Sequence, residues 1–323
     1  MTAARTVTSL LDGRSTEGDA PGGTLTIANP SRLEETVVGA QLGDAATFLD
    51  ACRRAKAAQP AWAAVPAPVR GRAIQQLGRL VEANAESLSR LVTREIGKPI
   101  RESRGEVQEV IDTCTFFLGE GRRLYGQTVP SEMPDKQLFT FRVPVGVAGI
   151  VTAGNFPVAV PSWYIVPALL CGNTVVWKPA EYTPATAEAF AQLILHAGFP
   201  RGAFQLVLAD GPQTFEGIER ALDGGVLDKV GFTGSTEVGS RIGELCGRHL
   251  QSPCLELGGK NPLVVMPDAD LDLAVEGALF SGFGTAGQRC TSLGTAIVHR
   301  DVHGDFMARF TKAATDAPIG DPT

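Results

Sequence analysis

Between residues 145 and 233 of this chain, short apolar runs rich in β-branched side chains alternate with longer stretches of helical periodicity. Strand–helix–strand alternation requires right-handed crossovers, which place successive strands parallel in one sheet and cover both of its faces with helices. We therefore predict an α/β fold built on an open parallel nucleotide-binding sheet with helices on both faces. The predicted strands are 145–152, 174–177, 204–208 and 229–233, and the predicted helices between them are 185–196 and 212–222.

The flanking segments divide the rest of the chain. We expect residues 1–125 and 147–258 to form the nucleotide-binding domain, residues 126–146 to bridge it with a strand at 137–143, and residues 259–323 to begin a second α/β domain. Helical spacing of apolar residues predicts one long helix over 66–92 and another over 107–118. The second domain has too few elements for a full core, so the apolar faces of 263–266 and 271–283 are expected to be partly uncovered and to drive association.

Composition limits the partners. The 323 residues carry a net charge of -6 and no run of Lys or Arg, which argues against nucleic acid or a membrane surface as a partner. The first ten residues lack the apolar core of a secretory signal, and three prolines interrupt the apolar stretch 156–172, which we interpret as buried. Six scattered cysteines without CxxC pairs predict neither a metal site nor disulfides, so we expect a cytoplasmic protein that acts on a small molecule.

Two segments at predicted strand ends could hold a dinucleotide. Gly234 and Ser235 lie between a strand and a helix, where free backbone N–H groups and the helix dipole favour a pyrophosphate; alternatively, Ser235 only caps the helix. Lys178 and Glu181 directly follow another strand and could contact ribose hydroxyls, with the glutamate favouring NAD over NADP, or they could be a solvated surface pair. The common G-x-G-x-x-G fingerprint is absent.

Three further segments carry candidate reactive groups. Asn155 follows an apolar strand and could stabilise an oxyanion, or it could satisfy a turn. Glu256 alternates with Leu255 and Leu257, so it is either a desolvated general base or a residue of an edge strand that faces water. Cys290 lies in a glycine-flanked loop beside Arg289, whose charge would favour the nucleophilic thiolate.

Together these segments resemble the aldehyde dehydrogenase superfamily, in order, from about residue 45 to the end of the chain. The motifs are Asn155-Phe156-Pro157, Lys178-Pro179-Ala180-Glu181, Phe232-Thr233-Gly234-Ser235-Thr236-Glu237-Val238-Gly239, Glu256-Leu257-Gly258-Gly259-Lys260 and Gly287-Gln288-Arg289-Cys290. The resemblance implies NAD as cofactor, with Thr152, Lys178, Glu181, Gly234, Ser235 and Leu257 as its contacts.

The same resemblance implies a mechanism. Cys290 attacks the aldehyde carbon, the Asn155 amide and the Cys290 backbone N–H hold the oxyanion, and a thioester forms as hydride leaves for the nicotinamide. Glu256 then activates the water that releases a carboxylic acid, which favours hydrolysis over transfer to coenzyme A. Residues 126–146 would contribute an oligomerisation strand, so a homo-oligomer is expected.

The chain departs from the family pattern in two places. Gly154 stands where many members have tryptophan. The family also continues beyond the equivalent of Thr323, with a further glutamate and phenylalanine at the nicotinamide ribose and a C-terminal oligomerisation strand. A truncated inactive remnant, one half of a split enzyme that needs a complementing C-terminal piece, and an esterase without hydride transfer are therefore alternative hypotheses.

The substrate is suggested by local likeness to the antiquitin-like branch, which oxidises α-aminoadipic semialdehyde. Glu106 and Arg289 would then bind the amino and carboxylate groups of an amino-acid semialdehyde. A surface position is the alternative explanation for Glu106.

Overall fold

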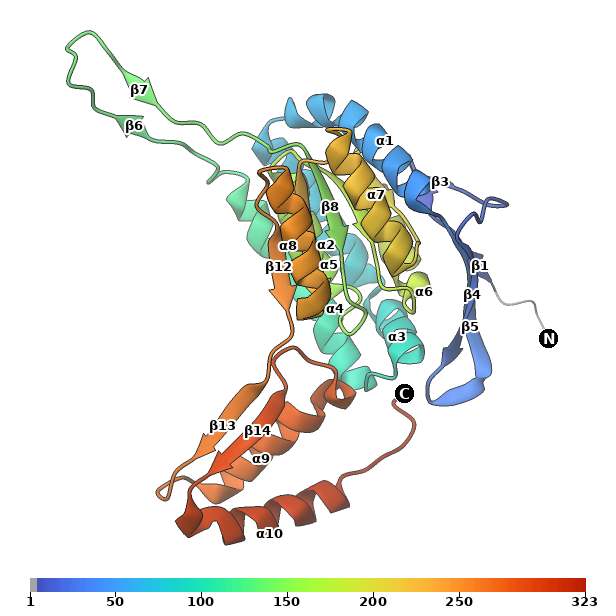
Figure 1. Ribbon diagram of the computed structural model, residues 1–323, viewed down its shortest axis with the longest axis vertical. Coiled ribbons are helices and arrows are strands. Elements are labelled where there is room, and N and C mark those ends of the chain that lie inside the picture. The colour runs from blue at the N-terminus through green and yellow to red at the C-terminus, as the bar shows by residue number, and fades with distance from the viewer. Residues whose placement is uncertain (1–4) are drawn as a thin grey trace.

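The computed structural model describes residues 5–323 and confirms the α/β fold (Figure 1). Its main sheet has seven strands in the order β12-β11-β8-β9-β10-β2-β3. The first five are parallel, as predicted, whereas β2 and β3 add two short antiparallel strands at one edge. In spatial order the strands are β12 (Cys254–Leu257), β11 (Lys229–Gly234), β8 (Val147–Val151), β9 (Thr174–Lys178), β10 (Phe204–Leu206), β2 (Leu10–Leu11) and β3 (Arg14–Ser15).

Helices cover both faces of the main sheet. On one face lie α1 (Ala45–Ala63), α7 (Gly211–Asp223) and α8 (Thr236–Arg248). On the other lie α5 (Ala159–Leu170) and α6 (Pro184–His196), with α2 (Ala67–Ala83), α3 (Ala85–Ile96) and α4 (Ile100–Glu120) packed outside them.

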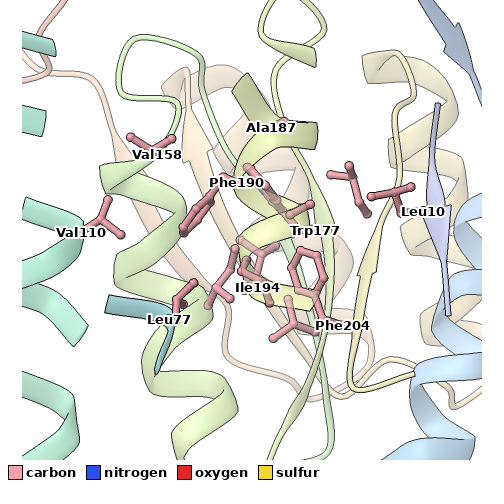
Figure 2. Close-up of a cluster of buried hydrophobic side chains, with 14 of the residues drawn as sticks. Leu10, Leu77, Val110, Val158, Trp177, Ala187, Phe190, Ile194 and Phe204 are labelled. Atoms are coloured by element: carbon pink, nitrogen blue, oxygen red, sulfur yellow. The ribbon is translucent and has the colours of Figure 1, made fainter. Parts of the chain in front are cut away.

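Alternating side chains of the strands supply the two cores on either side of the sheet. Val175 and Trp177 belong to the core under α5 and α6, whereas Val176 belongs to the core under α1, α7 and α8. Figure 2 shows Trp177 beside Phe190 and Phe204, with ring centroids 6.0 and 6.4 Å from that of Trp177. A strand that is buried on both faces has a continuous run of apolar residues in the sequence, which explains why β8 and β9 could be predicted.

The single helix predicted over 66–92 is two helices, α2 and α3. Asn84 separates them with a non-helical backbone conformation (φ -113°, ψ 12°), and its side-chain amide donates to the carbonyl of Leu80. Asparagine competes with the helix for backbone hydrogen bonds in this way, and the apolar spacing continues across the break. The periodicity therefore gave no sign of the interruption.

The N-terminal region forms a separate sheet of β1 (Thr6–Val7), β5 (Arg32–Leu42) and β4 (Gly23–Asn29). An arm of β6 (Thr128–Val129) and β7 (Leu138–Phe139) projects away from the rest of the molecule (Figure 1). The strand predicted at 137–143 is thus limited to β7, because β6 is its only partner among residues 5–323 and pairs with just two of its residues.

Residues 259–323 form a smaller lobe below the main sheet (Figure 1). It contains the parallel pair β13 (Asn261–Val265) and β14 (Leu293–Val298), with α9 (Leu271–Phe283) and α10 (Arg300–Asp316). As predicted, apolar side chains on 263–266 and 271–283 remain uncovered: Val264, Leu273 and Phe280 are 59%, 66% and 63% exposed. The tail after α10 returns to the main lobe, where the N–H of Ile100 donates to the carbonyl of Pro322.

Within residues 5–323, no helix has the length and hydropathy needed to cross a membrane.

Candidate active site

An open pocket of about 230 Å³ lies at the carboxyl ends of β8, β9 and β11. In parallel α/β sheets this edge is where ligands bind. Four of the predicted cofactor contacts line the pocket, together with apolar residues of α7 and α8. These four are Thr152, Lys178, Glu181 and Gly234.

Lys178 and Glu181 form an ion pair inside this pocket rather than a solvated surface pair. The Lys178 Nζ lies 2.7 Å from Glu181 Oε1, and the lysine side chain is 4% exposed whereas that of Glu181 is 34% exposed. Burial lowers the pKa of Lys178, and Glu181 opposes that effect. Thr152 is fixed beside them, because its hydroxyl accepts a 2.9 Å hydrogen bond from Trp177 Nε1.

The turn after β11 also has its predicted form. Ser235 is the N-cap of α8, and its hydroxyl accepts a 3.3 Å hydrogen bond from the N–H of Val238. Its side chain therefore caps the helix, as in the alternative interpretation, while the helix N-terminus still presents a partial positive charge to the pocket. A Cβ at Gly234 would lie 2.5 Å from the Phe232 ring, so a larger residue at this turn would displace that ring.

Leu257 lies outside the pocket lining. Its side chain packs against α8, where a Cβ on Gly239 would come within 2.4 Å of Leu257 Cδ2.

Tyr182 is a pocket residue that the sequence analysis missed. It lines the pocket with 49% of its surface exposed, and its ring lies over Gly154. A Cβ at Gly154 would be 2.4 Å from the Tyr182 ring. Gly154 is the position at which this chain departs from the family pattern. It is covered by an aromatic ring, that of Tyr182 in the loop after β9. The tyrosine next to Glu181 was the available signal.

Asn155 lies in the loop from β8 to α5 and contacts the loop that carries Cys290. Its Nδ2 donates a 2.8 Å hydrogen bond to the carbonyl of Gln288. Asn261, the first residue of β13, donates from its Nδ2 to the carbonyl of Cys290 at 2.9 Å. The Cys290 side chain is exposed. The structure thus brings Asn155 and the cysteine loop together at the junction of the two lobes.

The cysteine loop is strained. Thr285, Ala286 and Gly287 have φ values of 57°, 55° and 77°, a left-handed conformation that residues with a Cβ rarely adopt. The Thr285 N–H donates to Glu102 of α4, and Gln288 Nε2 donates to the carbonyl of Ile96 at 3.2 Å. Such strain persists where surrounding contacts impose it, and it is often found at functional sites.

The Arg289 side chain is held by contacts within the protein. Its Nε donates to Thr285 Oγ1 at 2.7 Å, its guanidinium lies 4.7 Å from the Phe280 ring centroid, and its Nη2 is 3.8 Å from Glu102. These contacts tie Arg289 to its own loop and to α4. They give no support to the predicted roles in binding a carboxylate or favouring the Cys290 thiolate.

Glu256 faces solvent, as in the second of the two alternatives that the sequence left open. It lies on β12, the edge strand of the main sheet, opposite Thr233 of β11. An edge strand has a neighbour on one side only, and within residues 5–323 nothing encloses this carboxylate. The alternation predicts that Glu256 lies on the opposite face of the strand from Leu255 and Leu257, as observed. Whether the Glu256 side chain is buried depends on what lies beyond this edge of the sheet.

Glu106 is neither a surface residue nor open to a substrate. It is 1% exposed and forms a buried ion pair with Lys98. Its Oε1 also accepts the N–H groups of Val158 and Ala159. Both carboxylate oxygens are therefore occupied within the protein, and its assignment to substrate binding is corrected.

Within residues 5–323, no cluster of three or more His, Cys, Asp or Glu side chains is arranged to hold a metal ion.

The model of the aldehyde dehydrogenase family matches residues 17–323. Aldehyde dehydrogenase family 7 member A1 of Pisum sativum is 37% identical over 309 residues, which cover 94% of this chain and 59% of the pea protein. Succinate-semialdehyde dehydrogenase [NADP(+)] GabD of Escherichia coli is 36% identical over 302 residues, 93% of this chain and 61% of that protein.

The solved structure of an NAD-dependent aldehyde dehydrogenase from Sinorhizobium meliloti has a TM-score of 0.93 at 33% identity, covering 99% of this chain and 63% of the other. This chain spans about three fifths of the length of these relatives. Because the family model matches residues 17–323, nearly the whole of this chain, the chain belongs to the aldehyde dehydrogenase family.

Proposed function

We propose that this protein oxidises an aldehyde to a carboxylic acid with NAD, using Cys290 as nucleophile, Asn155 as oxyanion donor and Glu256 as general base. The observation that carries the proposal is the contact between Asn155 and the cysteine loop, next to the pocket at the sheet edge. An amide nitrogen carries two N–H groups, and the bond to Gln288 uses one of them. The other is left for an oxyanion.

The pocket residues fit a dinucleotide. Glu181 and Lys178 stand where ribose hydroxyls would bind, and the N-terminus of α8 favours a pyrophosphate. The Glu181 carboxylate would repel a 2′-phosphate, which supports NAD over NADP. A bound nicotinamide would supply the hydride acceptor.

The protein's own groups would then perform the remaining steps. The Cys290 thiol loses its proton to solvent, its sulfur forms a bond to the aldehyde carbon, and Asn155 donates to the resulting oxyanion. Loss of hydride from that carbon leaves a thioester on Cys290. Glu256 takes a proton from water, the oxygen of that water bonds to the acyl carbon, and the Cys290 sulfur leaves with its electron pair. The product is a carboxylic acid, with the thiol restored when it regains a proton.

The substrate we favour is a semialdehyde, because GabD is named for a semialdehyde and the local sequence resembles the antiquitin-like branch.

We also propose a cytoplasmic location. The uncovered apolar side chains of α9 and β13 and the projecting β6–β7 arm support association, either with a second copy or with a complementing C-terminal piece.

The first test measures NADH formation at 340 nm from NAD and a panel of aldehydes that includes an amino-acid semialdehyde. Turnover that is lost in Cys290→Ala supports the proposal. Ester hydrolysis without NAD, in the absence of any dehydrogenase turnover, supports the esterase alternative. Folded protein that has neither activity contradicts the proposal and favours an inactive remnant or one half of a split enzyme.

A further inference from the structure

Lys98 and Glu106 form an ion pair with both side chains fully buried, at the corner between α3 and α4. Lys98 follows Gly97, the left-handed C-cap of α3 (φ 71°), and Glu106 lies nearly two turns into α4. Desolvation lowers the pKa of Lys98, and Glu106 opposes that effect. Burying two charges gains little stability compared with an apolar pair of the same size, so this pair invites an explanation other than stability.

The pair contacts the segment that immediately follows Asn155 in the chain. Lys98 Nζ lies 3.6 Å from the centroid of the Phe156 ring, a cation–π contact in a site that water does not reach. Further along, Glu106 Oε1 accepts the N–H of Val158 at 2.9 Å and that of Ala159 at 3.2 Å. The residues immediately following Asn155 are therefore fixed by one buried charge pair.

We propose that Lys98 and Glu106 are positioning residues, which hold the 156–159 backbone so that the Asn155 amide points at the oxyanion of the substrate bound to Cys290. The inference rests on the proposed role of Asn155. Charge-assisted hydrogen bonds in a site without water are stiff, and a misplacement of about 1 Å at a catalytic donor can cost about 100-fold in rate. In this view, Glu106 acts on the substrate only through Asn155.

Two variants distinguish the loss of the hydrogen-bond acceptor at position 106 from the loss of the two buried charges. Glu106→Leu removes the acceptor of the two N–H groups and leaves the ammonium of Lys98 without a partner. Glu106→Gln combined with Lys98→Met keeps an oxygen for Val158 and Ala159 while removing both charges, so it is expected to restore the loop. The matched control is Asp228→Leu. Asp228 also pairs with a lysine, Lys56 at 2.8 Å, and also accepts a main-chain N–H, that of Val147 at 2.8 Å, at the opposite end of β8 from Asn155.

The first readout needs no activity. Amide hydrogen exchange at Val158 and Ala159 is expected to accelerate about tenfold or more in Glu106→Leu, and to return toward the wild-type rate in the double variant. Asp228→Leu is expected to leave exchange at these two amides unchanged. Unchanged exchange in Glu106→Leu would overturn the proposal, whether or not the protein has dehydrogenase activity.

The second readout is a kinetic cycle with Asn155→Ala. Glu106→Leu is expected to lower kcat about 100-fold with KM for the nucleotide little changed, and to have almost no further effect once Asn155 is alanine. An equal loss in both backgrounds would mean a merely structural role and would overturn the proposal. If the wild-type protein has no turnover, the proposed function has failed, and hydrogen exchange alone decides whether the pair holds the loop.

Discussion

The side-chain amide of Asn155 donates to the main-chain carbonyl of Gln288, two residues before Cys290, at 2.8 Å. Asn155 belongs to a loop of the main sheet, whereas Gln288 belongs to the strained loop of the smaller lobe. This bond therefore spans the junction between the lobes and links the proposed oxyanion donor to the loop of the proposed nucleophile. A change at either end alters the geometry of both.

Replacing Asn155 with alanine is expected to lower kcat by about 10² to 10³, the usual cost of removing one oxyanion donor. The effect on KM is expected to be small, because the donor acts on charge that develops during the reaction. Steady-state NADH formation measures both parameters. The rate at which iodoacetamide alkylates Cys290, followed on its peptide, serves as the control for an intact loop. A large rise in KM with unchanged kcat would contradict the role.

Replacing Glu181 with glutamine is expected to improve NADP binding relative to NAD by about tenfold, because a negative charge near the ribose is removed. Dissociation constants for both nucleotides, measured by calorimetry, give the ratio without relying on turnover. Glu244→Gln on the exposed face of α8, where Glu244 pairs with Arg248, is the control. A ratio that stays the same in Glu181→Gln would remove Glu181 from cofactor selection.

Replacing Gly154 with alanine places a Cβ 2.4 Å from the Tyr182 ring and is expected to push that ring into the pocket. Nucleotide affinity is then expected to fall about tenfold, equivalent to about 1.4 kcal/mol of binding free energy. Adding Tyr182→Ala removes the collision with the ring, although Ala180 Cβ stays 2.9 Å from the new Cβ, and is expected to recover much of the loss. Gly105→Ala is the control, since a Cβ there meets nothing within 4 Å. Unchanged affinity in Gly154→Ala would show that the ring lies clear of the nucleotide.

Glu95 predicts a pH dependence of stability. Burial raises its pKa from an ordinary value of 4.5 to about 7, although its carboxylate accepts the N–H groups of Ala185 and Thr186 at 2.7 and 2.8 Å. Because the folded state holds this proton more tightly than the unfolded chain, the free energy of unfolding falls as pH rises from about 4.5 to about 7. The loss amounts to about 3 kcal/mol, relative to a group that does not titrate.

The comparison is with Glu95→Gln, which keeps an oxygen acceptor but cannot ionise. Urea unfolding at pH 4.5, 6 and 8 is expected to show the wild-type protein losing stability relative to this variant between pH 4.5 and 7, with a constant difference above that. A difference independent of pH would refute the raised pKa.

The parallel strands and the order of the motifs could be predicted because strands buried on both faces and Gly-containing turns leave local signatures. The predicted strand 174–177 matches β9, Thr174–Lys178, almost to the residue for this reason. Helix ends without such signatures were not predicted, as the break at Asn84 shows.

The environment of the site residues was harder to predict, because it depends on pairings distant in the sequence. Glu106 has the pattern of a polar residue on a helix, and only the turn at Gly97 brings Lys98 beneath it. The alternation around Glu256 is the same in a buried strand and in an edge strand. Its exposure follows only from the position of β12 in the sheet order. The contact between Tyr182 and Gly154 depends on the folded loop after β9 and could not be predicted from the sequence alone.

The position of Glu256 on an open strand has a consequence for the solubility of the protein. The outer side of β12 presents main-chain donors and acceptors with no neighbouring strand among residues 5–323, and such an edge templates pairing between molecules. A charged side chain on that edge discourages this pairing. A neutral replacement of Glu256 would remove the proposed base and the charge that discourages self-association at the same time, so lysine, which keeps a charge on the edge, is the replacement whose loss of turnover reports on chemistry.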